Sequence, residues 1–393
     1  MWRSEVETAD LHHDATLRDV AREWTRIGCI GFGGPPAHVV LLEELCVQRR
    51  RWLSADEFED AIASTNLLPG PGSTQLAIFC AWRVAGIRGA LIGGAGFILP
   101  GLVVILGLAV LFLANAPPRW VRGAGAGAGA AVAAVALRAG SDLLRPGWRR
   151  VTGAGRARWI AYALTGLVAA AVVGTWLVLL LLACGFVELT WRRTRQARPD
   201  LHAWPLLPLA LAGTGGLGAL AWVALKVGAL SYGGGFVIIP LMQADAVDTY
   251  GWMTSAQFLN AVALGQVTPG PVVHTVAVVG YAAAGIGGAL LATVVAFAPS
   301  FSFVLIGADR FDRLRSNASV RGFLDGAGPA AIGAIIGSAI PLARALEQPW
   351  QLALLAAAIV ALFALRRGVV LTLVAAGIAG AALALAGASL PPG

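Results

Sequence analysis

Three long apolar stretches constrain this chain more than any other feature of its sequence. They cover residues 89–113, 159–182 and 284–306. Roughly 20 apolar residues in a helix are enough to cross the hydrocarbon core of a bilayer. A helix also pairs its own backbone groups, which a segment surrounded by lipid must do. With 58% hydrophobic and only 13% charged residues, the sequence predicts an all-α integral membrane protein.

The basic residues favour a membrane partner over nucleic acid. The formal charge is +8 and the isoelectric point is near 10.1, but Arg residues cluster in short segments, 145–158 and 192–198, beside apolar stretches. Short basic loops set the topology of membrane proteins and lie next to anionic lipid. We therefore expect the lipid bilayer as a partner and no nucleic acid.

The N-terminus and the cysteines carry little further signal. Residues 1–26 are polar and lack the basic start and apolar core of a signal peptide, so we expect this end to stay in the cytoplasm. The cysteines lie singly, without CxxC spacing, at Cys29, Cys46, Cys80 and Cys184. They indicate neither a disulfide framework nor a metal site, and no cofactor is expected.

The second half of the chain repeats the first. At an offset of 200 or 199 residues, the matching positions include Arg26 and Lys226, Trp52 and Trp252, the two Pro-Gly-Pro segments, Gly86 and Gly285, and Arg122 and Arg321. Internal duplication of this kind is typical of secondary transporters. We expect a polar tail at 1–16, a first repeat at 17–190, an Arg-rich linker at 191–204 and a second repeat at 205–393.

Each repeat contains a short helix that ends at Pro-Gly-Pro. Ser54 with Glu57, and Thr254 with Gln257, match the capping box that begins a helix. The helix cannot continue through proline, so it has about a dozen residues and reaches about 18 Å, half of a bilayer. A second apolar helix begins just after each break. Its N-terminus, with unpaired amides and the positive end of the helix dipole, can bind an anion in the interior.

The position of these breaks has alternative interpretations. An ordinary interfacial loop between two short helices has the same local sequence, and an interior break can be a re-entrant hairpin or an interrupted crossing. We favour an interior break because both repeats carry the same capped, half-length helix. Broken helix ends at matching positions are typical of the binding site of a transporter.

Lys226 is the single lysine among 29 basic residues, and it lies within an apolar segment. An ionisable group at the bilayer centre costs at least about 2.5 kcal/mol on insertion scales, which favours a functional role. Its repeat equivalent is Arg26, and each precedes a glycine pair, Gly33-Gly34 or Gly233-Gly234, where the backbone can approach a ligand closely. The alternatives are a Lys226 that snorkels to a headgroup and an Arg26 that lies in an interfacial helix.

Neutral polar groups beside the breaks complete the expected binding site. Gln75, Thr268 and Thr275 are further hydrogen-bonding candidates, and His274 can also titrate near neutral pH or serve only a structural role. We expect no catalytic and no metal-binding residues. The predicted substrate-binding residues are Lys226, Arg26, Gly33, Gly34, Gly233, Gly234, Asn66, Pro69, Gly70, Pro71, Gly72, Ser73, Thr74, Gln266, Pro269, Gly270, Pro271 and His274.

Other polar features favour structural roles. The acidic residues at 43–44 and 56–60 could couple transport to protons, but a basic run and a capped helix start lie beside them, which favours an interfacial position. Asp325 is a lone carboxylate in a glycine- and alanine-rich segment. The small residues at 123–136 predict close helix packing. They do not form a phosphate loop, because no strand precedes them and no GK[ST] follows.

Six segments together resemble a known family. They are GFGGPPAH (31–38), RRRWLSADEF (49–58), NLLPGPGSTQLAIF (66–79), AGIRGALIGGAGFILPG (85–101), KVGALSYGGGFVIIPLM (226–242) and QVTPGPVVHTVAVVGY (266–281). In sequence and spacing they resemble the chromate ion transporter family, in its long-chain, two-domain form. The resemblance covers about residues 16–387.

This resemblance implies a carrier that exports chromate across the bacterial inner membrane and confers chromate resistance. It also implies two helical repeats inserted in opposite orientations. The motif positions it assigns here are Gly31, Phe32, Gly33, Gly34, Pro35, Pro69, Gly70, Pro71, Gly233, Gly234, Pro269, Gly270 and Pro271. Gly72 departs from the family, which commonly has a polar residue there, so backbone contacts would dominate at that position.

The charges agree with this implication. Lys226 and Arg26 could balance a tetrahedral dianion while the two half-helix N-termini supply amide donors. Export of two negative charges from a cell that is 100 mV negative inside gains about 4.6 kcal/mol. The sequence indicates no coupling ion, and it has no GxxxxGK[ST] segment that would bind ATP.

Three alternatives remain at this point. Sulfate or another tetrahedral oxyanion could be the substrate of the same fold. A membrane enzyme acting on a lipid phosphate is less favoured, because paired acidic metal ligands or a nucleophile and base are not found near the breaks. A passive subunit of a larger complex is the third alternative. The number of spans is open at 158–190 and 350–389, and so is the oligomeric state, for which a homodimer is one option.

Overall fold

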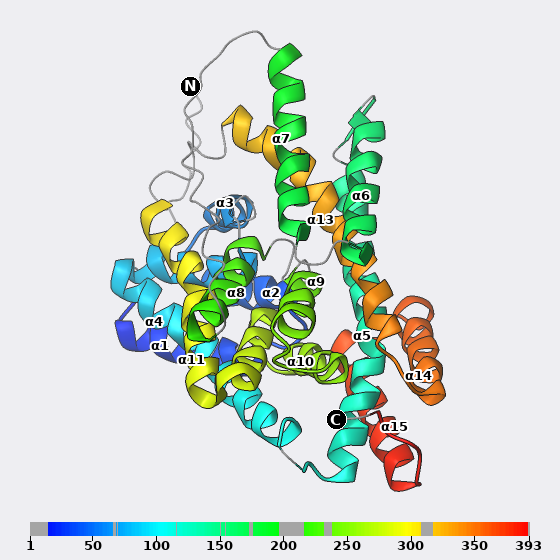
Figure 1. The fold of residues 1–393 in the computed structure, drawn as a ribbon. Helices are drawn as coiled ribbons and strands as arrows, with labels where there is room; N and C mark the ends of the chain where they lie inside the picture. The colour runs from blue at the N-terminus through cyan, green and yellow to red at the C-terminus, as the bar shows by residue number, and fades with distance from the viewer. Residues whose placement is uncertain are drawn as a thin grey trace, which may run out of the picture.

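The computed structural model describes residues 15–391 except 66–67, 69, 115, 150, 154, 173–175, 196–215, 232–237 and 308–316. Among the described residues, every regular element is a helix (Figure 1). The predicted all-α fold is confirmed.

The two repeats form the same series of elements. In the first repeat, α1 (Leu17–Ile30) is followed by α2 (Pro35–Glu43), the π-helical η1 (Glu44–Arg49), α3 (Ala55–Thr65) and α4 (Gly72–Phe112). In the second, α8 (Leu217–Leu230) is followed by α9 (Ile238–Gln243), the π-helical η3 (Ala244–Thr249), α10 (Ser255–Val267), the short 3-10 helix η4 (Val272–His274) and α11 (Thr275–Gly307). Even the π-helical turns recur at equivalent positions, so the duplicated sequence is a duplicated fold.

Capping boxes begin both short helices, as predicted. The Glu57 amide donates to the Ser54 hydroxyl at 3.2 Å, and the Ser54 amide donates to the Glu57 carboxylate at 3.0 Å. Thr254 and Gln257 form the same two bonds at 3.2 and 2.9 Å. The helix α3 has 11 residues and α10 has 13. The predicted half-length helices are therefore confirmed.

Both α4 and α11 contain a sharp reversal that the sequence reasoning missed. At Gly86 and Gly285 φ is +62°, a left-handed conformation that favours glycine. The chain then packs back on itself, because a Cβ placed on Gly89 would lie only 2.3 Å from the carbonyl oxygen of Ala81. The second repeat has an equivalent close contact. Each half-helix that follows Pro-Gly-Pro thus forms a hairpin with the long helix after it.

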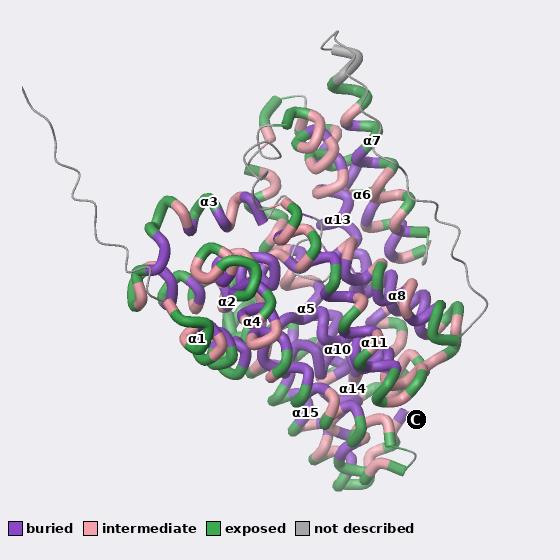
Figure 2. The backbone as a smooth tube through the Cα atoms, turned by 90° about the vertical axis from the view of Figure 1, so that its left-hand side faces the viewer, coloured by how far each residue is buried: buried purple, intermediate pink, exposed green. Residues whose placement is uncertain are grey.

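The fold divides into two groups of helices, and each group contains helices from both repeats. In each group a helix of one repeat packs on its equivalent from the other, α4 on α11 and α5 (Arg119–Arg149) on α13 (Ala318–Arg344). In the core group, α1–α4 and α8–α11, α4 packs on α1 and α11, and α8 packs on α11 (Figure 1). The flanking group contains α5, α6 (Gly155–Val172), α7 (Leu177–Arg195), α13, α14 (Pro349–Ile359) and α15 (Val369–Leu385). The groups meet chiefly where α10 lies against α5, in a well-buried part of the molecule (Figure 2).

The small residues of α5 allow very close packing, as predicted. A Cβ placed on Gly127 would lie 2.2 Å from the carbonyl oxygen of Ala376 in α15, and a Cβ on Gly123 would lie 2.5 Å from that of Gly380. Larger side chains would push these backbones apart, which explains the glycine and alanine content of the segment.

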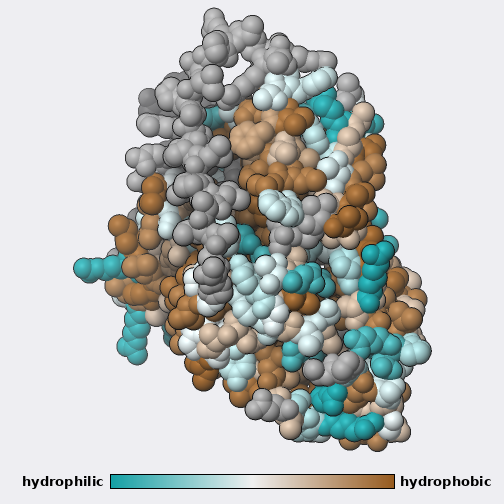
Figure 3. Space-filling view, viewed as in Figure 1, coloured by the Kyte–Doolittle hydropathy of each residue, from teal (hydrophilic) through white to brown (hydrophobic). Residues whose placement is uncertain are grey.

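Four helical segments of the described chain are long and apolar enough to cross a membrane, and two of them include the half-helix that precedes the reversal at Gly86 or Gly285. They are Gly72–Phe112, Arg119–Arg149, Val272–Gly307 and Ala318–Arg344. Apolar side chains cover much of the visible surface, as expected for helices that contact lipid (Figure 3). These features support a multi-pass membrane protein.

The described residues of 158–190, where the sequence leaves one long helix or two short ones open, do not form one continuous helix. They are divided between α6 and α7, which pack against each other. The carboxylate of Glu188 in α7 has a side chain only 3% exposed and accepts from Arg158 of α6 at 2.8 Å. This ion pair links the two helices laterally, so two short helices replace one long one. Residues 350–389, left open by the sequence, also form two helices, α14 and α15.

Candidate functional site

Both Pro-Gly-Pro turns lie inside the protein. Gly70 and Gly270 have φ of +120° and +89°, and both are buried together with Pro71 and Pro271. An ordinary connecting loop runs over the surface, where water pairs its backbone groups. The structure therefore favours the interior break over the interfacial loop.

Each turn contacts the opposite repeat. The Gly270 amide donates to the Gly31 carbonyl oxygen at 2.9 Å. In the reciprocal contact, a Cβ placed on Gly70 would lie 3.2 Å from the carbonyl oxygen of Gly228 in α8. The predicted breaks are thus brought together at an interface between the two repeats.

His38 connects the two turns, and the sequence reasoning missed it. Its Nδ1 lies 3.2 Å from Ser73 Oγ, and its Nε2 lies 2.9 Å from the Gly31 carbonyl oxygen. Because a carbonyl oxygen only accepts, Nε2 carries the proton. In a neutral ring Nδ1 then accepts a hydrogen bond that the Ser73 hydroxyl donates. The Phe97 ring packs against the imidazole edge at a centroid distance of 5.0 Å. The position of His38 within GFGGPPAH was the available signal.

Thr74 and His274 occupy equivalent positions in the two repeats, at the third residue after each Pro-Gly-Pro. Both side chains are fully buried. Thr74 Oγ1 has no hydrogen-bond partner among the described residues, and neither ring nitrogen of His274 makes a well-formed bond, although the Ile98 carbonyl lies near the ring. Burial of a polar group without a partner is costly. Two such groups at equivalent positions make this part of the two repeats a candidate binding site.

The backbone adds donors at the same places. Pro71 precedes α4 without any side-chain cap, and Pro271 precedes η4 in the same way. The Thr74 and Gln75 amides donate to the Pro71 carbonyl oxygen, and the His274 amide donates to that of Pro271. The first two amides after each proline are the ones that lack an acceptor of this kind. The amides that follow each proline therefore lie at the positive end of a buried half-helix, which is a favourable position for an anion.

Further buried polar atoms lie on the elements around the turns. Gln266, which was predicted, has a buried Nε2 that makes no bond with the described protein. The sequence reasoning missed three more such atoms, because isolated polar residues in apolar helices carry no periodic signal. They are Ser231 Oγ, Gln243 Oε1 and Ser300 Oγ.

Lys226 is paired with a carboxylate and does not present a free positive charge in the structure. Its Nζ donates to Asp245 Oδ2 at 2.6 Å, and the side chains are only 14% and 4% exposed. Asp245 escaped notice because it lies 19 residues further along, on the π-helical η3. Lys226 also lies over the Trp222 ring, at 5.8 Å from its centroid.

The remaining predicted residues have different positions. Arg26 lies exposed on α1, so the structure does not bring it to the buried turns. Gly33 and Gly34 have φ of +101° and +73°, as a glycine break requires, and a Cβ on Gly34 would lie 3.9 Å from Val272 Cγ2. Four predicted residues lie outside the described part of the chain: Asn66, Pro69, Gly233 and Gly234.

The acidic residues lie away from the turns. Asp325 is paired with Arg192 at 2.8 Å, so it is not a lone carboxylate. Glu57 pairs with Arg83. Burial acts to raise the pKa of Glu57, but the Ser54 amide and the Arg83 guanidinium hold it below its ordinary value. The other carboxylates of the two acidic clusters are exposed: Glu43, Glu44, Asp56, Glu59 and Asp60.

The family profile described as "Chromate transporter" matches residues 18–189 and 218–391. This chain belongs to the chromate transporter family. The "Chromate transport protein" of Cupriavidus metallidurans is 32% identical over 370 residues, covering 91% of this chain and 89% of that protein. The protein of the same description from Pseudomonas aeruginosa is 32% identical over 376 residues, covering 90% and 89%. No solved structure matches the chain.

The family match and the structural duplication coincide. The first matched region runs from α1 to α7 and the second from α8 to α15, so each match covers one structural repeat. A "Probable chromate transport protein" of Synechococcus elongatus is 28% identical over 345 residues, covering 85% of this chain and 86% of that protein. In this member of the chromate transporter family, the cluster at the turns combines GFGGPPAH from one repeat with TPGPVVH from the other.

Proposed function

We propose that this chain is a secondary carrier that exports chromate across the bacterial inner membrane and thereby confers chromate resistance. The observation that carries the proposal is the pair Thr74 and His274, equivalent buried polar side chains without a well-formed protein bond at the amide ends of two half-helices. A tetrahedral oxyanion offers acceptors to both. The names of the curated relatives support chromate as the substrate.

The site replaces part of the water that an oxyanion loses on entry. Thr74 supplies a hydroxyl donor, His274 supplies a ring N–H, and the amides after each proline supply backbone donors. A hydrogen bond to a charged group contributes about 1.5–3 kcal/mol. Several such bonds, together with two helix dipoles, offset the desolvation of the anion.

Lys226 contributes positive charge through an exchange of partners. It lies two residues before Gly228, whose carbonyl oxygen adjoins the Gly70 turn. In the absence of substrate, Asp245 neutralises it. A dianion in the site attracts the ammonium group, and the flexible four-carbon lysine stem allows it to turn from Asp245 toward the anion.

Alternating access follows from movement of the core group against the flanking group. Glycines of α5 face α10, and a Cβ on Gly129 would lie 3.1 Å from the Leu259 Cβ. A smooth helix face of this kind permits sliding. We assign the two duplicated units to residues 17–190 and 205–393, joined by 191–204, and expect them to be inverted in the membrane.

The membrane potential suffices to drive export. When two negative charges leave a cell whose interior is 100 mV negative, the free energy falls by about 4.6 kcal/mol. That corresponds to more than a thousandfold concentration ratio, since each 1.4 kcal/mol is a factor of ten.

Uptake of chromate by inverted membrane vesicles tests the proposal. Vesicles that contain the protein should accumulate chromate. Uptake should be faster when an inside-positive potential is imposed, and excess sulfate should inhibit chromate uptake only weakly. Vesicles from cells without the protein provide the background. Accumulation of sulfate with no accumulation of chromate would exclude the chromate assignment and leave an oxyanion carrier of different selectivity.

A further inference from the structure

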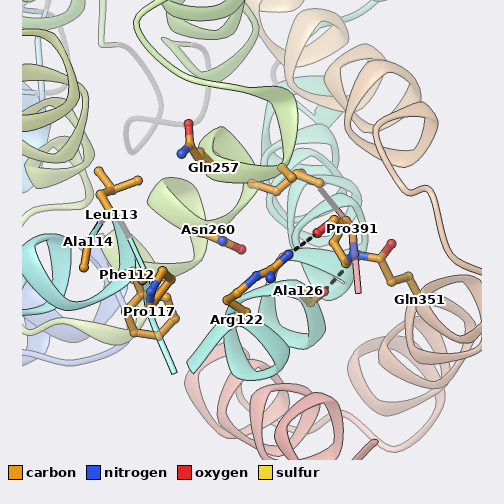
Figure 4. Close-up of a pocket in the computed structure, with 14 residues that line it drawn as sticks. Phe112, Leu113, Ala114, Pro117, Arg122, Ala126, Gln257, Asn260, Gln351 and Pro391 are labelled. Atoms are coloured by element: carbon orange, nitrogen blue, oxygen red, sulfur yellow. Dashed lines mark hydrogen bonds between the residues drawn. The ribbon is translucent and has the colours of Figure 1, made fainter. Parts of the chain in front are cut away.

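A cavity of about 550 Å³ lies where the core group meets the flanking group. Its walls come from the end of α4, from α5, from the first turns of α10 and from α14 (Figure 4). It is separate from the buried turns, which lie at the opposite end of α10. The residues that give it polar character are Arg122, Gln257, Asn260 and Gln351.

Arg122 is the only charged residue among those that line the cavity. One nitrogen of its guanidinium, Nη2, donates to the Pro391 carbonyl oxygen at 2.9 Å, which holds the side chain in place. A guanidinium has five N–H donors, so others stay available. The cavity therefore has a net positive charge, held in a fixed position.

Asn260 supplies a second polar group to the same space. Its side chain and that of Arg122 extend toward the same part of the cavity (Figure 4). The Asn260 Oδ1 atom is buried and has no protein partner among the described residues. A nearby water would satisfy it, and the amide nitrogen could donate to an anion. The repeat equivalent of Asn260 is Asp60, whose negative charge would repel an anion.

The size of the cavity indicates a hydrated ligand. Each water occupies about 30 Å³ of liquid volume, so the cavity has room for an oxyanion with much of its hydration shell. An anion held here keeps its water, and the full desolvation cost arises only at the buried turns.

The helix α10 joins this cavity to the site. Leu259 lines the cavity, and Gln266, with its unpartnered Nε2, lies seven residues later on the same helix face. Seven residues of helix span about 10 Å. The cavity and the Pro-Gly-Pro turn of the second repeat therefore lie about two helical turns apart along one helix.

We propose that this cavity is a vestibule in which Arg122 and Asn260 bind the hydrated oxyanion before it reaches the turns. This inference rests on the proposed function. It assigns Arg122 to substrate capture, separate from the groups that bind the dehydrated ion.

Chromate uptake into proteoliposomes, with the concentration of chromate varied, tests the vestibule. In Arg122→Gln the KM should rise about tenfold, the effect of losing one charge-assisted hydrogen bond, while the maximal rate changes less than about twofold. Arg122→Lys should stay within about threefold of the wild type. The wild-type KM should also rise with ionic strength, because salt screens the attraction, whereas the KM of Arg122→Gln should not.

Arg119→Gln is the matched control. Arg119 lies one helical turn earlier on α5 and also holds the C-terminal segment, through bonds of 2.7 Å to the Ala384 and Ala388 carbonyl oxygens, but it does not line the cavity. Its KM should equal that of the wild type. If Arg122→Gln does not insert, Asn260→Asp takes its place, with a KM also raised about tenfold.

The outcomes separate the two proposals. Suppose that the wild type takes up chromate and that the inserted variant has the same KM and the same salt dependence as the wild type. This result would overturn the vestibule and leave the proposed function standing. A similar KM increase in Arg119→Gln would also overturn it, because loss of the C-terminal contact would then explain the effect. Absence of chromate uptake by the wild-type protein would overturn the proposed function and the vestibule with it.

Discussion

Lys226 and Asp245 form a buried ion pair in the second repeat, with Nζ and Oδ2 separated by 2.6 Å. The equivalent positions of the first repeat are Arg26 and Leu45, which cannot form the same pair. In the first repeat the buried Glu23 of α1 pairs instead with Arg49 and Arg50, so both repeats have an ion pair between the first helix and the π-helical segment, made by different residues.

Replacement of Asp245 by Asn should destabilise the protein strongly. The change leaves the Lys226 ammonium buried without its counter-charge, and breaking a buried pair in this way costs about 3–5 kcal/mol. Thermal unfolding of the purified protein in detergent, followed by tryptophan fluorescence, measures the loss. An unfolding temperature equal to that of the wild type would show that Lys226 finds water or another partner.

The double variant Lys226→Met with Asp245→Leu separates stability from transport. Apolar replacement of both members of a buried pair is often neutral or stabilising, and Leu is the residue of the first repeat at this position. We expect wild-type stability with transport reduced at least about tenfold, since one group that attracts the anion has been removed. Undiminished chromate uptake by this variant would remove Lys226 from the binding site.

Thr74→Val should reduce transport without loss of stability. The hydroxyl has no partner among the described residues, so its removal breaks no hydrogen bond. The unfolding temperature should therefore be unchanged or higher. Chromate uptake should fall about tenfold if the hydroxyl binds the anion. Measurement of both quantities on the same preparation is decisive, because a purely structural role predicts the opposite pattern.

Thr293→Val provides the comparison for Thr74. Thr293 is also a buried threonine, in α11, but its Oγ1 donates to the Ala289 carbonyl oxygen at 2.8 Å. Its loss should lower the free energy of unfolding by up to about 1 kcal/mol and leave the KM for chromate unchanged. Equal transport defects in the two variants would contradict a specific role for Thr74.

His38→Ala should loosen the contact between the repeats. The change removes bonds to Ser73 and Gly31 and leaves a cavity beside Phe97, at a combined cost of about 3–5 kcal/mol. Ser73→Ala removes only one of these bonds and should cost about 1 kcal/mol. Thermal unfolding compares the two, and equal destabilisation would show that the Gly31 contact contributes nothing.

Gly129→Val should block movement between the core and flanking groups. The new side chain would meet Leu259 across the α5–α10 interface. Even a Cβ alone, added at Gly129, would lie 3.1 Å from the Leu259 Cβ. Overpacking of this kind costs about 1–3 kcal/mol, and we expect transport to fall about tenfold or more. The control is Gly107→Val in α4, where no atom lies within 4 Å of the added Cβ. If both variants transport normally, the interface does not move during the cycle.

The local features of this fold could be predicted because each depends on a few neighbouring residues. The capping boxes at Ser54 and Thr254 and the helix breaks at Pro-Gly-Pro follow from backbone geometry within one or two turns. The reversals at Gly86 and Gly285 escaped prediction because an isolated glycine in a helical segment is often tolerated. Only the contact of the chain with itself shows that these two glycines adopt a left-handed conformation.

The sequence by itself determined the membrane setting, the duplication, the half-length helices and the family, since composition and repeated motifs report these directly. Only the tertiary structure decided that His38 joins the two turns, that Asp245 neutralises Lys226 and that Arg26 lies exposed on α1. Gly31 and Gly270 form a hydrogen bond although more than half of the chain separates them in sequence. Hydropathy and periodicity describe each helix alone, and contacts between distant helices depend on how all of them pack.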